Sequence, residues 1–266
     1  MLSVANKVAV VIPDQHAPLF DVPALNCVLK AIEIIKPDIV INLGDAGENE
    51  GSSYFKWKKK QKPPLSYILP AVHQDIKDVN LWFNLLDQTC DKAGVDRRVF
   101  TQGNHDQWLD FFAEYYESLE GHGYDNKSAY KIAERGYEWY DYGEYARLGD
   151  QLLYHGGHFT NQFHAKAHAI NLSANIIYAH SHAYQSFAHP TLDGYVTARC
   201  IGFLGAMKKG FMKGRPHSWS HNFSVIYYDS DEIGRVIDYE IKNGITYVNN
   251  VVVNGNEGIA SCLNNF

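Results

Sequence analysis

The sequence predicts an α/β fold in which two mixed β-sheets pack together as a sandwich flanked by helices. Up to about residue 136, strand-like and helix-like segments alternate, which is typical of a β-α-β succession. Beyond that point the chain consists mostly of short strand-like segments separated by Gly and Asp. No linker rich in Pro, Gly or Ser divides the 266 residues, so we interpret 1–266 as a single domain.

The N-terminal segment predicts two neighbouring parallel strands joined by a helix. Lys7–Ile12 (KVAVVI) and Asp38–Leu43 (DIVINL) are continuous apolar runs, which indicate strands buried on both faces. Between them, Val22–Ile35 has apolar residues at helical spacing, with Asp21 as a candidate N-cap and Pro37 after its end. A strand-helix-strand unit of this kind places its two strands parallel in one sheet.

The middle of the chain predicts an insertion and then further elements of the first half. Residues 46–74 are interpreted as an irregular insertion that carries the basic run KWKKKQKPP at 56–64. After it we expect helices over 75–93, 108–119 and 127–135, and a strand over 97–101. In the C-terminal half we expect one helix around 165–171 and strands within 145–154, 175–178, 195–201, 223–228, 236–241 and 245–253.

Composition excludes several classes of protein. A formal net charge of −6 argues against a broad basic face for sequence-independent binding to nucleic acid. The cysteines are scattered, which excludes a CxxC zinc site and a dense disulfide framework: Cys27, Cys90, Cys200 and Cys262. No segment has the pattern of a signal peptide or the ~20 apolar residues of a membrane span. We therefore expect a cytoplasmic protein without a membrane partner.

Five short segments hold oxygen and nitrogen ligands, and each follows an apolar strand-like run. They are Asp14-Gln15-His16, Gly44-Asp45, Gly103-Asn104-His105-Asp106, His155-Gly156 and His180-Ser181-His182. The carboxyl ends of parallel strands meet at one edge of a sheet, so the segments are expected to converge. In extended backbone an Asp-x-His or His-x-His pair points both side chains to the same side. Any one segment alone is more often a turn or a helix cap, and only the ordered set is informative.

The ligand types indicate a site for two divalent ions. Carboxylate and amide oxygens mixed with imidazoles suit Mn²⁺, Fe²⁺ or Zn²⁺ better than a soft thiolate site would. Two divalent ions, balanced by two carboxylates and a hydroxide, leave about one positive charge to hold an anionic substrate. Such a site activates water for attack on a phosphate ester. A structural zinc-only site is disfavoured, because no thiolate takes part.

On these segments the chain resembles the calcineurin-like metallophosphoesterases, and most of all their stand-alone members from bacteriophages and bacteria. The family pattern runs D-x-H, G-D-x-x-D/E, G-N-H-D/E, a lone His and G-H-x-H. All five parts occur here in order between residues 14 and 182, with Ala179 in place of the last glycine. The resemblance implies the family's sandwich fold. If the chain is phage-encoded, the cytoplasm expected above would be that of the host.

The resemblance also implies a role for each residue. Asp14, His16 and His182 would hold the first metal ion, and Asn104, His155 and His180 the second, with Asp45 bridging them. His105 would face the substrate as a catalytic residue, and Asp106 would orient it. The ions would be Mn²⁺ first, with Fe or Zn as alternatives, and a metal-bridging hydroxide would attack phosphorus directly and in line.

Three questions stay open at this point. His158 and His164 compete with His155 for the role of the lone histidine ligand. The substrate could be a nucleotide-type phosphomonoester or diester, or a nucleic acid held as a nuclease substrate by the basic run, through Trp57, Lys58, Lys59 and Lys60. The run could also be an ordinary solvated loop, and the fold could serve as a non-catalytic scaffold.

Overall fold

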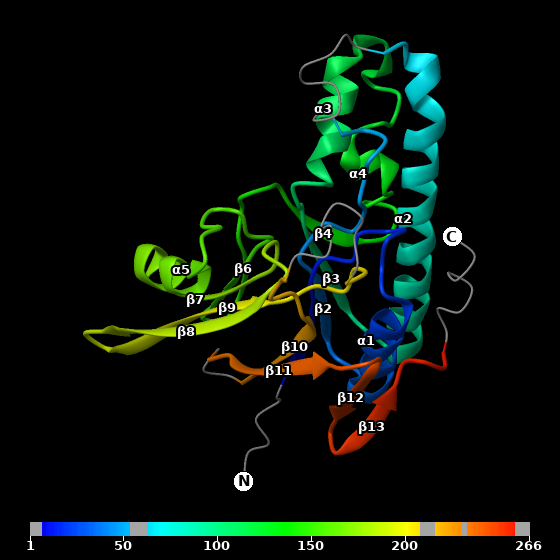
Figure 1. The fold of residues 1–266 in the computed structure, drawn as a ribbon. Coiled ribbons are helices and arrows are strands. Elements are labelled where there is room, and N and C mark those ends of the chain that lie inside the picture. Colours follow the sequence, from blue (N-terminus) through cyan, green and yellow to red (C-terminus); the bar gives the residue numbers. More distant parts are fainter. Residues whose placement is uncertain (1–6, 54–62, 208–215, 230–232, 259–266) are drawn as a thin grey trace.

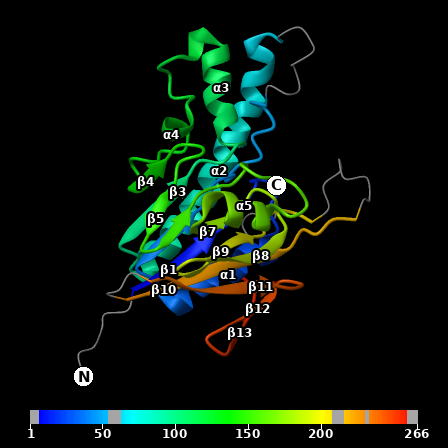
Figure 2. The ribbon, with the colours of Figure 1, turned by 90° about the vertical axis from the view of Figure 1, so that its left-hand side faces the viewer.

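The computed structural model describes residues 7–53, 63–207, 216–229 and 233–258 (Figure 1). Two large sheets, of six and five strands, pack against each other, and a separate two-stranded hairpin lies beside the first helix. Helices cover the outer faces of both large sheets (Figures 1 and 2). The predicted fold class, two mixed sheets packed as a sandwich and flanked by helices, is confirmed.

The six-stranded sheet contains the predicted N-terminal unit at its centre. Its first four parallel strands are β1, β2, β3 and β4, and β10 and β11 extend it antiparallel beyond β1. Their bounds in spatial order are β11 (Arg235–Ile241), β10 (His221–Tyr228), β1 (Lys7–Ile12), β2 (Ile39–Asn42), β3 (Arg97–Thr101) and β4 (Tyr137–Tyr140). The expected parallel pairing of the first two strands is therefore confirmed.

The five-stranded sheet is built from the second half of the chain and is also mixed. In spatial order it comprises β5 (Ala146–Leu148), β6 (Gln151–Leu153), β7 (Asn175–Tyr178), β9 (Gly194–Ile201) and β8 (Tyr184–Thr191). Strands β6, β7 and β9 are parallel, and the two edge strands are antiparallel to their neighbours. The small hairpin pairs β12 (Ile245–Val248) with β13 (Val251–Asn254).

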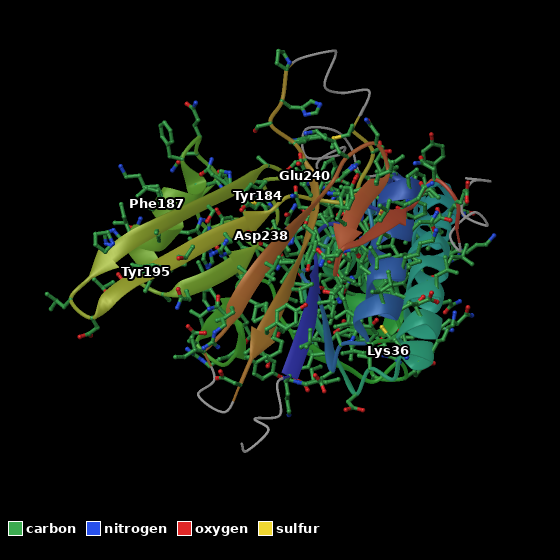
Figure 3. All side chains as sticks on the ribbon, turned by 90° about the horizontal axis from the view of Figure 1, so that it is seen from below. Lys36, Tyr184, Phe187, Tyr195, Asp238 and Glu240 are labelled. Atoms are coloured by element: carbon green, nitrogen blue, oxygen red, sulfur yellow. The ribbon has the colours of Figure 1, made fainter. Side chains whose placement is uncertain are left out.

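Alternation along β1 and β2 explains why both faces of the six-stranded sheet are apolar. Val11 and Ile41 belong to the core between the two sheets, while Val10 and Val40 pack under the helices. This arrangement accounts for the continuous apolar runs in the sequence, because each successive side chain finds a buried layer. A polar link joins the sheets as well, since the Tyr184 hydroxyl of β8 donates to Asp238 of β11 over 2.8 Å (Figure 3).

The helices agree with the sequence in part. Helix α1 (Val22–Ile35) has the expected bounds, and the Asp21 carboxylate caps it by accepting from the Ala24 amide. Helix α2 (Leu65–Ala93) begins at Leu65 rather than Asp75, so the interpretation of 46–74 as irregular throughout is wrong. In the part of the chain that the structure describes, no helix is long and apolar enough to cross a membrane.

Packing explains the early start of α2. Pro70 lies inside the helix and removes one backbone hydrogen bond, which argues against helix when the local sequence is considered alone. Ile68 and Val72, on either side of it, are buried in the core beneath the helix, and burial of such side chains outweighs one missing bond. The start of α2 and helix α3 (Gln107–Tyr115) both extend beyond the sheets at the top of Figures 1 and 2.

The remaining differences concern short elements. The helix expected over 108–119 is observed as α3 followed by a 3₁₀ turn, η2 (Glu117–Leu119). In place of the helix expected over 127–135 there is the shorter α4 (Asn126–Ala129), which begins just before that range. Strands β4 and β8 were not expected. The segment 245–253 is a hairpin because Asn249 and Asn250 both adopt positive φ angles, 49° and 64°, which suits a tight two-residue turn. Helix α5 (His164–Leu172) agrees with expectation.

Candidate metal centre

The seven predicted ligands lie together where strands of both sheets end. Asp14 and His16 follow β1, Asp45 follows β2, and Asn104 follows β3 in the six-stranded sheet. His155 follows β6, and His180 and His182 follow β7 in the five-stranded sheet. The loops after β1 and β2 are joined directly, since the Gln15 and His16 amides donate to the Asp45 carbonyl. Sheet packing therefore converts five separate segments into one cluster.

Three of the ligands form a first set. The Nε2 atoms of His16 and His182 are 3.0 Å apart, and Nε2 of His182 is 3.1 Å from Oδ2 of Asp14. All three side chains are buried or nearly so. The set has the spacing of a group that could hold one metal ion.

Three others form a second set on the far side of Asp45. Nε2 of His155 is 3.1 Å from Oδ1 of Asn104 and 3.2 Å from Nδ1 of His180. Nδ1 of His180 is 2.8 Å from the same Asn104 oxygen. His155 and His180, with Asp45, again have the spacing of a metal-holding group.

Asp45 lies between the two sets. Its Oδ2 atom is 3.4 Å from Nε2 of His155 and 3.9 Å from Nε2 of His16. Its Oδ1 atom accepts from the His105 amide over 2.8 Å, which fixes the direction of the carboxylate. One oxygen is thus held by backbone, and the other is turned toward both sets.

The donor and acceptor chemistry of the second set fits a cation. Nδ1 of His155 lies 2.8 Å from the Leu43 carbonyl and must donate to it, so in the neutral imidazole it is Nε2 that carries the lone pair. That lone pair faces the Asn104 and Asp45 oxygens, which are also acceptors. Acceptors that converge without a shared proton repel one another, and a divalent ion about 2.0–2.2 Å from each would set them roughly 3.0–3.5 Å apart. The distances from Nε2 of His155 to the Asn104 and Asp45 oxygens, 3.1 and 3.4 Å, agree with that range.

Four of the ligands adopt a backbone conformation that the sequence did not indicate. His16, Asp45, His180 and His182 have φ angles of 56°, 46°, 64° and 60°. Such angles are uncommon for residues with a side chain and cost free energy, so their clustering here points to a functional constraint. The expectation that Asp-x-His and His-x-His point their side chains together in extended backbone is therefore wrong. Left-handed turns aim these imidazoles instead.

Glycines let the ligand loops approach each other. A Cβ atom on Gly103 would lie 2.2 Å from Oδ1 of Asp45, and one on Gly44 would lie 2.4 Å from the Gly103 nitrogen. A Cβ on Gly156 would lie 2.8 Å from the Cβ of His180. These glycines therefore relieve crowding between the ligand loops.

Replacement of Gly103 with Ala is expected to destabilise the protein by ~3 kcal/mol or more, because the Asp45 loop has to move. Urea denaturation followed by circular dichroism measures the change. Gly121→Ala is the matched control, since its Cβ would meet no atom within 4 Å and only the positive φ of 73° costs free energy, about 1–2 kcal/mol. Equal losses in the two variants would contradict the crowding argument.

Burial is the largest single influence on the pKa values of the cluster. It raises the pKa of the Asp14 carboxyl to about 7, although the His155 imidazole opposes it. Burial acts in the same direction on Asp45, but the surrounding imidazoles, His155 first, hold the pKa of that carboxyl below its ordinary range. Burial lowers the pKa of His180 to about 3, which keeps its imidazole neutral and able to offer a lone pair. The charged form of Asp14 is thus costly here, and a bound cation would offset that cost.

His105 lies at the edge of the cluster and is partly exposed. Its Nδ1 atom donates to the Glu48 carbonyl over 2.8 Å, and its ring packs on Trp108. The ring also lies near His16 and Asp45 at a spacing that could hold a metal ion. These contacts leave Nε2 as the ring nitrogen not used by the Glu48 loop.

Asp106 does not orient His105, contrary to expectation. Its buried carboxylate accepts from the Gly103 amide over 2.9 Å, from the Ala46 amide over 3.1 Å and from the Tyr130 hydroxyl over 3.3 Å. These bonds join the loops after β2 and β3. The orienting contact to the His105 imidazole comes from Glu48, through its carbonyl. Asp106 is therefore a loop-positioning residue in this structure.

Among the three histidines that could be the lone histidine ligand, His155 is the one whose imidazole contacts Asn104, His180 and Asp45. His158 packs against the Tyr145 and Tyr154 rings, and His164 bonds to Tyr178. Ala179, the residue before His180, packs in the core between the sheets. The predicted substrate-binding residues Trp57, Lys58, Lys59 and Lys60 lie outside the described residues.

Sequence reasoning missed a buried polar layer beneath the ligands. Gln15 and Asn42 exchange two hydrogen bonds, of 3.1 and 2.8 Å, and Trp82 donates to Gln15 over 3.0 Å. The contact between Glu48 and His16 was not predicted either; the Glu48 carboxylate lies 3.1 Å from Nδ1 of His16. The only sequence signals were a polar residue inside an apolar strand, at Asn42, and the acidic residue of the G-D-x-x-E segment.

Comparison with known proteins gives structural likeness without sequence likeness. No protein-family model matches this sequence, and no curated protein matches it. Solved structures that are similar include Vps29 of Chaetomium thermophilum, at 12% identity and a TM-score of 0.44, covering 92% of this chain and 95% of that one. YfcE, a phosphoesterase from E. coli, matches at 17% identity and a TM-score of 0.39, covering 86% and 98%. Purple acid phosphatase PPD1 of yellow lupin matches at 12% identity and a TM-score of 0.46, covering 92% and 53%. Similarity at this level assigns no activity.

Proposed function

We propose that this chain is a metal-dependent phosphoric ester hydrolase of the calcineurin-like type, with Mn²⁺ as the first candidate ion and Fe or Zn as alternatives. One observation carries the proposal: two sets of converging ligand atoms lie around the Oδ2 atom of Asp45, which is 3.4 Å from Nε2 of His155 and 3.9 Å from Nε2 of His16. Bound divalent ions would activate water and neutralise charge on the ester. The substrates we favour are nucleotide-type monoesters or diesters.

The chain's own residues would supply the rest. Asp14, His16 and His182 would hold one ion, and Asn104, His155 and His180 the other. The Leu43 carbonyl keeps the His155 tautomer correct for binding, as outer contacts of metal-binding histidines commonly do. His105, through the ring nitrogen not bonded to Glu48, would stabilise charge on the phosphoryl oxygens or protonate the leaving oxygen.

Metal-dependent hydrolysis is the direct test. The purified protein, stripped with a chelator and reloaded with Mn²⁺, is expected to hydrolyse p-nitrophenyl phosphate or bis(p-nitrophenyl) phosphate at least ~10³-fold faster than the stripped protein. The ratio of the two rates measures the preference for monoesters or diesters. Binding of Mn²⁺ without hydrolysis of either ester or of nucleotides would contradict the proposal and favour a non-catalytic scaffold.

A nuclease activity is the second candidate, and its support is the basic run in the sequence at 56–64. A single-stranded oligonucleotide, assayed beside the small diester, tests it. Replacement of Lys58, Lys59 and Lys60 by Gln would slow cleavage of the oligonucleotide alone if the run binds nucleic acid.

A further inference from the structure

A polar pocket of about 280 Å³ opens beside the second set of ligands. His180 and Ser181 form part of its wall, so the pocket shares a residue with the candidate metal centre. Other lining residues include Thr160, in the segment that leads into α5, and His164, the first residue of that helix. Its volume is too small for a large ligand and is suited to a group the size of one sugar or one base.

The lining of this pocket is polar but uncharged. Hydroxyl groups come from Thr160, Ser181 and Ser218, and amide side chains include that of Gln185. Among the described residues that line it, none carries a carboxylate, an ammonium or a guanidinium group. Hydroxyl and amide groups recognise neutral groups that donate and accept hydrogen bonds, and they give little selectivity for a second charged group.

The walls of the pocket are held in place by hydrogen bonds. The Oε1 atom of Gln185 accepts from the Ala165 amide over 2.9 Å, and its Nε2 atom donates to the Gln162 carbonyl over 3.0 Å. Strand β8 thereby fixes the segment that leads into α5. A pocket that is already formed costs less free energy to fill than one that must first become ordered.

His164 gives the pocket a buried polar group of its own. His164 is only 4% exposed, and its Nδ1 atom lies 2.6 Å from the Tyr178 hydroxyl. Nε2 makes no hydrogen bond to any residue in the described part of the chain, and His164 lines the pocket. Burial lowers the pKa of this imidazole, so it is neutral near pH 7. Because a hydroxyl can donate or accept, Tyr178 allows Nε2 to act in either sense.

We propose that this pocket binds the organic group of the phosphate ester, a neutral group bearing hydroxyls such as a nucleoside sugar, with His164 as a specificity-determining residue. The inference rests on the proposed function, because an ester at the metal centre would place one substituent next to His180. It adds to that function a substrate class, namely esters whose retained substituent is polar and uncharged.

Two diesters with one common leaving group test the pocket. Thymidine 5′-(p-nitrophenyl phosphate) and bis(p-nitrophenyl) phosphate both release p-nitrophenol, and they differ only in the second substituent. His164→Asn keeps a polar atom at the Nδ1 position for Tyr178 and removes Nε2. Thr160→Trp fills the pocket from its exposed rim without disturbing the core. Thr191→Trp, the same exchange at an exposed site on the β8–β9 hairpin, is the matched control.

We expect His164→Asn and Thr160→Trp to lower kcat/KM for the thymidine ester about 10-fold, the size of one lost hydrogen bond or of a blocked subsite. The rate with bis(p-nitrophenyl) phosphate should stay within about twofold, as should both rates in Thr191→Trp. In the metal-free protein, thymidine 5′-phosphate should shift the His164 imidazole signals in long-range ¹H–¹⁵N spectra.

The outcomes separate the two proposals. Hydrolysis of both diesters with equal losses, or with no loss, in the two pocket variants would overturn the pocket and leave the hydrolase intact. Unchanged His164 signals on addition of thymidine 5′-phosphate would also count against the pocket. Failure of the Mn²⁺-loaded wild-type protein to hydrolyse either diester would overturn the hydrolase and the pocket together.

Discussion

Replacement of Asp45 with Asn is expected to lower kcat/KM for phosphate-ester hydrolysis by ~10³-fold or more and to weaken binding of both metal ions. The substitution is nearly isosteric, and Asn tolerates the φ of 46° found at this position. An Asn oxygen can also accept from the His105 amide, as Oδ1 of Asp45 does. What the variant loses is the anionic oxygen between the two ligand sets. The effect should therefore be electrostatic, with little loss of folding stability.

Isothermal titration with Mn²⁺, beside steady-state kinetics, measures both parts of this effect. Asp193→Asn is the control, because it makes the same change on the exposed turn between β8 and β9. A variant at Asp45 that binds two ions with wild-type affinity and turns over at the wild-type rate would contradict the bridging role.

Replacement of His105 with Ala is expected to keep both metal ions and to lower kcat by about 10²–10⁴-fold. The bond from the residue-105 amide to Asp45 does not involve the side chain, so the Asp45 carboxylate should stay in place. Removal of the ring loses the Nδ1 bond to the Glu48 carbonyl, but the bonds from the Ala46 and Gly103 amides to the Asp106 carboxylate do not involve the ring and should keep the loops joined. The loss should appear in kcat rather than in metal affinity.

His122→Ala, at an exposed position in the loop after η2, is the control for this variant. A wild-type rate in His105→Ala would exclude a catalytic role. Loss of one ion would instead identify His105 as a ligand, which its spacing from His16 and Asp45 permits.

Elements with a strong and unambiguous pattern could be predicted from the sequence. The bounds of β1, α1, β3 and β7 agree with expectation, because each is an apolar run or stripe ended by Pro, Gly or a polar ligand segment. Strand β8 could not be predicted, since its exposed edge position leaves it a polar sequence with Pro190 near its end. The start of α2 depends on core contacts of Ile68 that no local pattern contains.

The ligand set could be predicted as residue types in order, but its geometry could not. Left-handed backbone at His16 and His182 is fixed by neighbouring loops, and nothing in an isolated Asp-x-His pattern indicates it. The same holds for Asp106, whose carboxylate joins two loops by accepting from backbone amides at Ala46 and Gly103. Backbone groups are the same at every position of a chain, so such contacts leave no signature in residue types.

Each set of ligands takes residues from both sheets, Asp14 with His182 in one and Asn104 with His180 in the other. An ion bound to either set would therefore tie together residues far apart in the chain, since His16 and His182 are separated by 166 positions and Asn104 and His180 by 76. The two ions would therefore cross-link the two sheets, and each ion site would exist only when the sheets are packed together. Neither half of the protein could then keep an ion alone, and release of the ions and separation of the sheets would become one coupled event.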